Sequence, residues 1–206
     1  MAAYNCPVCS VNNEPAGQKF DRDYYQCAGC ASLYTQELPQ AGMVGGTGQE
    51  DRNAVNSVRL EVLRHLGVVT LLDYGCGNGQ LVQAAGTAGF LATGYDPFNP
   101  TYALKPAGAF DGVTLIEVVE HLYHPFAELD FVRARLAPEG IVYVETSFAD
   151  FTPLAAPYVD PRIGHHVIFS FHGLDQLMAE KGLVLRAALN RNVRVYQMRH
   201  SAGKLA

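Results

Sequence analysis

Apolar residues in this chain occur in short continuous runs that alternate with segments of helical spacing. Four runs have the length and composition of buried strands: residues 68–72, 90–95, 110–116 and 141–146. Apolar positions three and four residues apart predict helices around and between them: residues 50–65, 80–88, 125–136 and 174–181. Residues 182–189 and 193–198 read as a terminal hairpin. Strands that alternate with helices predict an α/β fold with a mostly parallel sheet.

Composition limits the class of protein. The 206 residues leave room for one sizeable core and a small appendage, and 49% apolar with 17% charged residues is ordinary for a globular protein. A net charge of -5 disfavours a nucleic-acid partner. The sequence shows neither an apolar stretch of membrane-spanning length nor a signal-peptide pattern, so we expect a cytoplasmic protein without a membrane partner.

Four cysteines near the N-terminus form two C-x-x-C pairs. Cys6 and Cys9 are separated by 17 residues from Cys27 and Cys30. Two such pairs suit one tetrahedral zinc ion, and a closed site of four cysteines is structural rather than catalytic. Two disulfides or a redox pair are the alternatives, and both fit a cytosolic chain poorly. We therefore predict a zinc ribbon over residues 1–38, a glycine-rich linker over 39–49 and the main domain over 50–206.

A glycine-rich loop follows the first predicted strand of the main domain. Asp73 precedes Gly75, Gly77 and Gly79, and a helix begins directly after them. Glycines at these positions let the backbone turn tightly and let a nucleotide lie against it. Asp96 lies 21 residues after Gly75, at the end of the next strand, where a carboxylate can accept both hydroxyls of a ribose. An ordinary turn is the alternative for each feature.

Several motifs in order give the chain a family resemblance. The loop from Asp73 to Gly79 resembles motif I of the class I S-adenosylmethionine-dependent methyltransferases, a Rossmann-like, doubly wound fold. Residues 117–122 (Glu-Val-Val-Glu-His-Leu) resemble motif IV of the ubiquinone-biosynthesis type, and residues 136–140 and 165–170 resemble later elements of that group. The resemblance covers about residues 55–200. It implies S-adenosylmethionine as cofactor, bound through Asp73, Gly75, Gly77, Gly79 and Asp96.

Residues 97–110 depart from that family pattern. They are short and rich in proline and glycine, where the family has a helix and a third strand. The sequence therefore identifies no residue of the adenine pocket.

The expected acceptor site follows the third buried strand. Glu117, Glu120 and His121 would share one face of a helical turn. The constellation resembles that of small-RNA 3′-terminal 2′-O-methyltransferases, in which a later histidine completes a magnesium or manganese site; here that histidine would be His165 or His166. Without a metal, His166 is the best candidate for the base. A similar histidine occurs in zinc-ribbon sugar C-methyltransferases.

These features predict O-methylation of a small-molecule acceptor, with catalytic residues Glu117, Glu120, His121 and His166. Three alternatives stay open. The chain could be a sugar C-methyltransferase-like enzyme, an interaction protein whose methyltransferase domain has lost catalysis, or a nicotinamide-dependent oxidoreductase, since the glycine loop and Asp96 also suit NAD.

Overall fold

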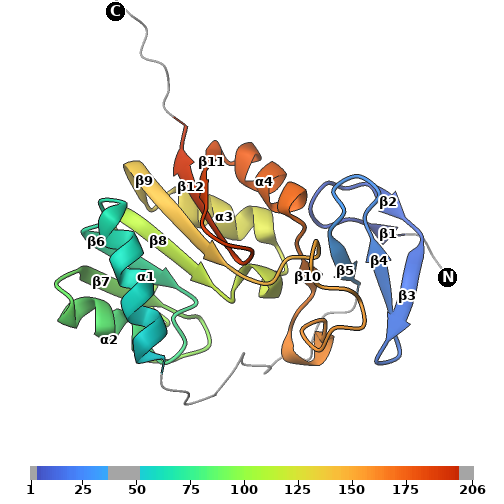
Figure 1. Ribbon diagram of the computed structural model, residues 1–206, viewed down its shortest axis with the longest axis horizontal. Helices are drawn as coiled ribbons and strands as arrows, with labels where there is room; N and C mark the ends of the chain where they lie inside the picture. Colours follow the sequence, from blue (N-terminus) through green and yellow to red (C-terminus); the bar gives the residue numbers. More distant parts are fainter. Residues whose placement is uncertain (1–3, 37–51, 200–206) are drawn as a thin grey trace, which may run out of the picture.

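The computed structural model describes residues 4–36 and 52–199. Its main sheet has the strand order β11-β12-β9-β8-β6-β7 (Figure 1). The strands are β6 (Thr70–Tyr74), β7 (Leu91–Tyr95), β8 (Phe110–Ile116), β9 (Leu136–Glu145), β11 (Leu183–Ala188) and β12 (Val193–Met198). β7, β6, β8 and β9 pair in parallel, whereas β12 runs antiparallel to both β9 and β11. The mostly parallel α/β sheet and the terminal hairpin are confirmed.

Helices cover both faces of this sheet. They are α1 (Asn53–His65), α2 (Gln80–Thr87), α3 (Pro125–Arg133) and α4 (Phe171–Glu180). Leu71 packs with the buried residues of α1 and α2, and the next residue, Leu72, packs with those of α3 and α4. Neighbouring strand residues point to opposite faces, so a strand that is covered on both faces is apolar at successive positions, as at Leu71 and Leu72. None of the described helices is long and apolar enough to cross a membrane.

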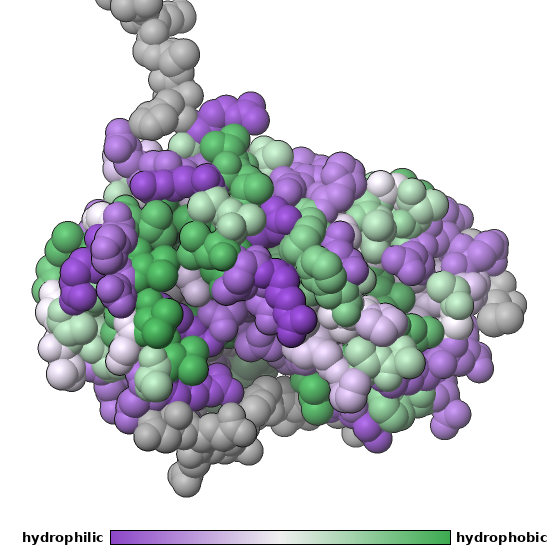
Figure 2. Space-filling view, in the orientation of Figure 1, coloured by the Kyte–Doolittle hydropathy of each residue, from purple (hydrophilic) through white to green (hydrophobic). Residues whose placement is uncertain are grey.

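The face that α1 buries differs from the prediction. Val55 and Val58, two of the apolar positions from which the helix over residues 50–65 is predicted, are 51% and 62% exposed, whereas Asn56 and Arg59 are buried. Figure 2 shows hydrophobic surface on this side of the molecule. The helix is turned because the Arg59 guanidinium donates to both carboxylate oxygens of Glu145, at 2.9 and 2.6 Å. Such a two-pronged ion pair satisfies charges that are costly to bury alone.

Two element boundaries also need correction. The helix predicted to reach residue 136 ends at Arg133, and the turn expected at 137–140 belongs to β9, which begins at Leu136. The run at 90–95 is not a buried strand: β7 is an edge strand, and Leu91 is 68% exposed. Residues 97–109 contain neither helix nor strand, so no strand of the described chain pairs with the outer edge of β7. The departure from the family pattern at this point is confirmed.

The N-terminal unit contains two small antiparallel sheets. β1 (Tyr4–Asn5) pairs with β2 (Asn12–Asn13). The second sheet has the order β10-β5-β4-β3, with β3 (Pro15–Lys19), β4 (Arg22–Gln26), β5 (Leu33–Thr35) and β10 (Val167–Ile168). β10 comes from the main domain, so the two units share a sheet (Figure 1). The predicted linker, residues 39–49, lies outside the described residues.

We expect Arg59→Met to lower the free energy of unfolding by about 3–5 kcal/mol, because it leaves the Glu145 carboxylate without its cation. Urea unfolding followed by circular dichroism measures this. Asp130→Asn is the matched control: it removes the ion pair with Lys181, in which the Asp130 side chain is 64% exposed. That loss should cost less than about 1 kcal/mol. Equal effects of the two substitutions would contradict our account of α1.

Candidate functional site

Polar side chains gather where the parallel strands end. Parallel strands place their carboxyl ends at one edge of a sheet, and ligands of open α/β sheets bind there. The segments that follow the strands at this edge begin with the glycine loop after β6, Asp96 after β7, Glu117 after β8 and Thr146 after β9. The sequence thus brings the expected donor and acceptor residues to the same edge.

The three glycines of the loop all have positive φ, at +78° for Gly75, +54° for Gly77 and +73° for Gly79. A Cβ on Gly75 would lie 2.4 Å from Val118, and one on Gly79 would lie 2.1 Å from the Tyr102 hydroxyl, so both positions exclude a side chain. Gly77 is exposed, with nothing within 4 Å of its Cβ position. This open backbone at the start of α2 fits a nucleotide-type ligand.

Asp96 is tied to the glycine loop. One carboxylate oxygen accepts from the Gly77 N–H at 2.9 Å and the other from the Phe98 N–H at 2.9 Å. The Asn99 side chain donates to the Gly77 carbonyl at 2.7 Å. Residues 96–102 therefore fold back over the loop, and Tyr102 lies against Gly79. No sequence pattern indicates the roles of Asn99 and Tyr102, since both depend on this fold-back.

Asp73 is placed differently from Asp96. It is 5% exposed, inside the sheet, and accepts a hydrogen bond from the Thr114 hydroxyl of the neighbouring strand at 2.7 Å. Burial raises the pKa of its carboxyl to about 6. Its side chain supports the loop from behind, while Asp96 keeps partial contact with solvent.

Glu120 is at the centre of the expected acceptor site. It lies in the short turn η1 (Val119–His121) and has no exposed surface. Its carboxylate accepts hydrogen bonds from the hydroxyls of Thr146, at 3.0 Å, and Tyr158, at 2.5 Å. Its backbone carbonyl accepts from the His166 N–H at 2.9 Å. Glu120 thus connects a long later segment, residues 146–170, to the turn after β8. We call residues 146–170 the bridging segment.

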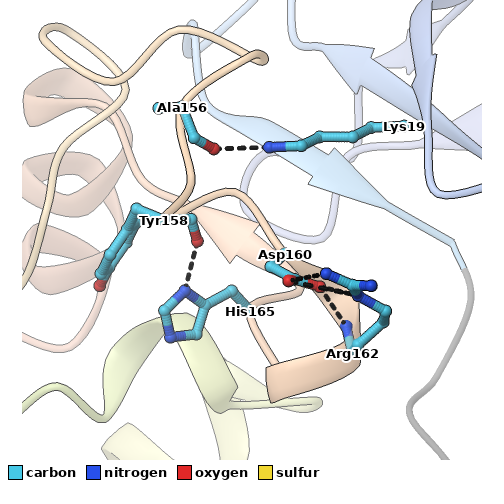
Figure 3. Close-up of polar contacts among 6 residues, drawn as sticks. All are labelled: Lys19, Ala156, Tyr158, Asp160, Arg162 and His165. Carbon is cyan, nitrogen blue, oxygen red and sulfur yellow. Dashed lines mark hydrogen bonds and ion pairs between the residues drawn. The ribbon is translucent and has the colours of Figure 1, made fainter.

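Two histidines join Glu120. Ligand atoms of Glu120, His121 and His165 lie within 4.8 Å of one another. The His165 Nδ1 lies 2.6 Å from the Tyr158 carbonyl, which can only accept, so Nε2 is the nitrogen with a free lone pair (Figure 3). Burial lowers the pKa of His121, and lowers that of His165 to about 4. Neutral imidazoles are the form that binds metals.

The backbone around this cluster is unusual at two places. Gly164 has φ +89°, and a Cβ there would lie 2.8 Å from the His121 ring. Glu117 has φ +52°, which is uncommon for a residue with a side chain and typical of functional sites. It precedes the turn instead of lying on it, so the expected helical turn over residues 117–121 is wrong. The pKa of Glu117 is raised to about 8 by desolvation and by the nearby Glu120 carboxyl, although its side chain keeps contact with solvent.

His166 lies outside the cluster of Glu120, His121 and His165. It is 5% exposed, its ring lies 4.4 Å from that of Tyr123, and neither ring nitrogen has a hydrogen-bond partner among the described residues. Burial lowers its pKa to about 4. The structure therefore brings His165, not His166, to Glu120 and His121.

The four N-terminal cysteines form a second cluster, with their sulfur atoms within 4.8 Å of one another and no disulfide. Their two loops have the same backbone: Ser10 and Ala31, which follow the second cysteine of each pair, have φ of 61° and 60°. Backbone N–H groups point at the sulfurs of Cys6 and Cys27, each at 3.4 Å. N–H donors stabilise thiolates, so these four sulfur atoms could hold a metal ion.

Comparison with known proteins defines the family. A family model for a methyltransferase domain matches residues 33–188, more than half of the chain. The chain belongs to this family and is an S-adenosylmethionine-dependent methyltransferase. The match favours the donor expected from the glycine loop over the nicotinamide alternative. No curated protein has a matching sequence.

Solved structures share the fold. The 1,6-didemethyltoxoflavin-N1-methyltransferase of Burkholderia thailandensis, with bound S-adenosylhomocysteine, matches with a TM-score of 0.60 and 15% identity over 91% of this chain and 100% of that chain. Streptomyces venezuelae DesVI matches with a TM-score of 0.56 and 16% identity over 74% and 93%. NcsB1, an O-methyltransferase from neocarzinostatin biosynthesis, matches with a TM-score of 0.55 and 19% identity, over 71% of this chain and 57% of its own. At these identities the likeness establishes the fold.

We expect Asp96→Ala to weaken the binding of S-adenosylhomocysteine by about 1.5–3 kcal/mol, the range for hydrogen bonds to a charged group. Titration calorimetry measures it. Asn99→Ala is the control, because it removes a contact between residues 96–102 and the glycine loop but leaves the carboxylate. If both variants bind equally weakly, Asp96 only ties the loop, and its assignment to the ribose fails.

Proposed function

We propose that this methyltransferase transfers the methyl group to an oxygen atom of a small molecule, and that a magnesium or manganese ion held by Glu117, Glu120, His121 and His165 binds that oxygen. The observation that carries the proposal is the convergence of Glu120, His121 and His165 within 4.8 Å at the carboxyl edge of the sheet. Carboxylates suit both ions, and imidazole nitrogens complete such sites.

The donor side of the proposal uses the residues predicted from the sequence. S-adenosylmethionine supplies a methyl group on a positively charged sulfur. The open backbone at Gly77 gives it room, Gly75 and Gly79 shape the loop, Asp73 supports the loop from within the sheet, and Asp96 accepts the ribose hydroxyls. The residues present therefore fit this cofactor.

The acceptor side must both position a hydroxyl group and remove its proton. A divalent ion at this place would lower the pKa of a bound hydroxyl. His121 and His165 offer neutral nitrogens. Glu117 and Glu120, whose pKa values are raised, would supply negative charge once a bound ion displaces their protons. Tyr158 and Thr146 hold the Glu120 carboxylate in one orientation by their hydroxyl groups. Such support of a ligand by neighbouring hydrogen bonds is typical of metal sites.

Direct proton removal by His166 is the alternative mechanism. Its favourable features are a position next to the Glu120 turn and two ring nitrogens without partners. A pKa near 4, however, makes the imidazole a weak base at neutral pH. The metal version therefore accounts better for the site.

The nature of the acceptor rests on the fold relatives. The methyltransferase of B. thailandensis was solved with 1,6-didemethyltoxoflavin, and NcsB1 with 1,4-dihydroxy-2-naphthoic acid, both small molecules. The net charge of -5 also favours a small molecule over a nucleic acid. Methylation of a sugar carbon would contradict the proposal, and so would the absence of any methyl transfer.

A screen of hydroxylated small molecules with methyl-labelled S-adenosylmethionine would test the reaction. On the acceptor it finds, we expect activity to vanish with a chelator and to return with Mg²⁺ or Mn²⁺, and we expect His165→Ala to be as damaging as Glu117→Ala. If instead the chelator has no effect and His166→Ala lowers kcat by about 10²–10⁴-fold, His166 is the base. Zinc content is measured in parallel, so that loss of the N-terminal metal is recognised.

We also propose that Cys6, Cys9, Cys27 and Cys30 hold one structural zinc ion. Metal analysis should find one zinc per chain, and Cys9→Ser should lower that content. Since the N-terminal unit has little core of its own, zinc supplies much of its folding free energy, on the order of 10 kcal/mol. A metal-free protein whose N-terminal amides are protected from hydrogen exchange would contradict this assignment.

A further inference from the structure

We infer that the N-terminal cysteine unit is a positioning element of the acceptor site: it holds the bridging segment, residues 146–170, so that His165 and Tyr158 stay next to Glu120. The inference rests on the proposed function of the Glu120 cluster. The inference extends that function, because the four-cysteine unit then determines the geometry of a second site, which lies in the main domain.

The first link is a shared sheet. β10 of the bridging segment pairs with β5 of the N-terminal unit, with Val167 opposite Tyr34 and Ile168 opposite Leu33. The Thr35 N–H donates to the His166 carbonyl at 3.0 Å, while the His166 N–H donates to the Glu120 carbonyl at 2.9 Å. The backbone of one residue thus joins the N-terminal unit to the turn after β8.

The second link runs through the cysteine loop itself. The Ser170 N–H donates to the Ser32 hydroxyl at 3.1 Å, and the Ser170 hydroxyl donates to the carbonyl of Cys30. Ser170 is also the N-cap of α4 and accepts from the Gly173 N–H at 2.8 Å. The loop that carries Cys30 therefore rests directly on the start of α4, two residues after β10.

The third link is on the opposite side of the bridging segment. The Lys19 ammonium donates to the Ala156 carbonyl at 2.5 Å (Figure 3). The Arg162 guanidinium lies 3.7 Å from the centre of the Phe20 ring. Between these contacts, four buried residues of both units form an apolar cluster: Tyr24, Leu33, Val159 and Ile168. The segment is thus held along its length.

These links matter because the bridging segment has little regular structure. Apart from η2 (Pro161–Ile163) and β10, it contains no helix or strand among residues 146–170. Its conformation must come from what it touches: Glu120, the N-terminal unit and, near its start, the main core that Phe148 joins. The glycine loop and Asp96 make none of the contacts described here, so the donor site should not respond when the unit is displaced.

Gly173→Ala tests the inference without substituting a cysteine. A Cβ at Gly173 would lie 2.3 Å from the Ser32 hydroxyl and 3.4 Å from the Cys30 sulfur, so it pushes the cysteine loop off α4. Alanine favours the helix itself. Gly86→Ala in α2 is the matched control, because nothing lies within 4 Å of its Cβ position.

The readouts are hydrogen exchange, Mn²⁺ binding and S-adenosylhomocysteine binding by the full chain. We expect Gly173→Ala to speed amide exchange of residues 156–168 by about tenfold. It should weaken Mn²⁺ binding by about tenfold while S-adenosylhomocysteine binds within about twofold of wild type. Gly86→Ala should change none of the three.

Unchanged exchange and unchanged Mn²⁺ binding in Gly173→Ala would overturn the inference. If wild-type protein binds no Mn²⁺ but exchange still rises, the inference holds and the metal of the proposed function fails. Should Gly173→Ala not fold, Lys19→Met repeats the test far from the cysteines, and unchanged exchange near Ala156 in that variant would overturn the inference equally.

Discussion

The proposed acceptor end of this molecule depends on one buried carboxyl group, that of Glu120. It has no exposed surface, and it is fastened by two hydroxyl donors from the bridging segment. A carboxylate in such a place is costly unless it is hydrogen-bonded and its charge is met by a proton or a cation. Burial raises the pKa of the Glu120 carboxyl, because its charged form is poorly solvated there. A metal ion bound at this place would have to displace that proton.

The two units contribute different parts of the candidate site. The main domain carries the glycine loop and Asp96 on strands of its own sheet, with helices on both faces. The bridging segment leaves that sheet after β9, passes Glu120, contributes β10 to the N-terminal sheet and returns as α4. The cysteine unit is thus no separate appendage, since one of its sheets contains a strand of the catalytic domain.

Much of this could be predicted because local pattern and burial agree. The strand runs, the glycine loop and the paired cysteines follow from residue types at fixed spacing, and the family match over residues 33–188 agrees with the motifs. The buried face of α1 was missed because Arg59 is buried by an ion pair with Glu145, 86 positions away along the chain. β7 looked buried because its apolar run resembles that of a central strand; the only sign that the next strand is missing lies in the short segment 97–110 that follows it.

The roles of Tyr158 and of β10 could not be predicted for a related reason. Tyr158 reaches Glu120 only through the path of an irregular segment, and a strand of two residues has no pattern of its own. The choice between His165 and His166 was equally open, because neighbouring residues differ only in the direction that the backbone gives them. The positive φ of Gly164 lets that backbone approach His121 closely enough for His165 to join the cluster.

The most direct test is a crystal structure with S-adenosylhomocysteine and Mn²⁺, with anomalous scattering recorded at the zinc and manganese edges. Our account predicts zinc among the four cysteines and manganese bound by Glu117, Glu120, His121 and His165, with the sulfur of the cofactor product facing the manganese. Manganese absent from that cluster, or a cofactor sulfur that points away from it, would contradict the account.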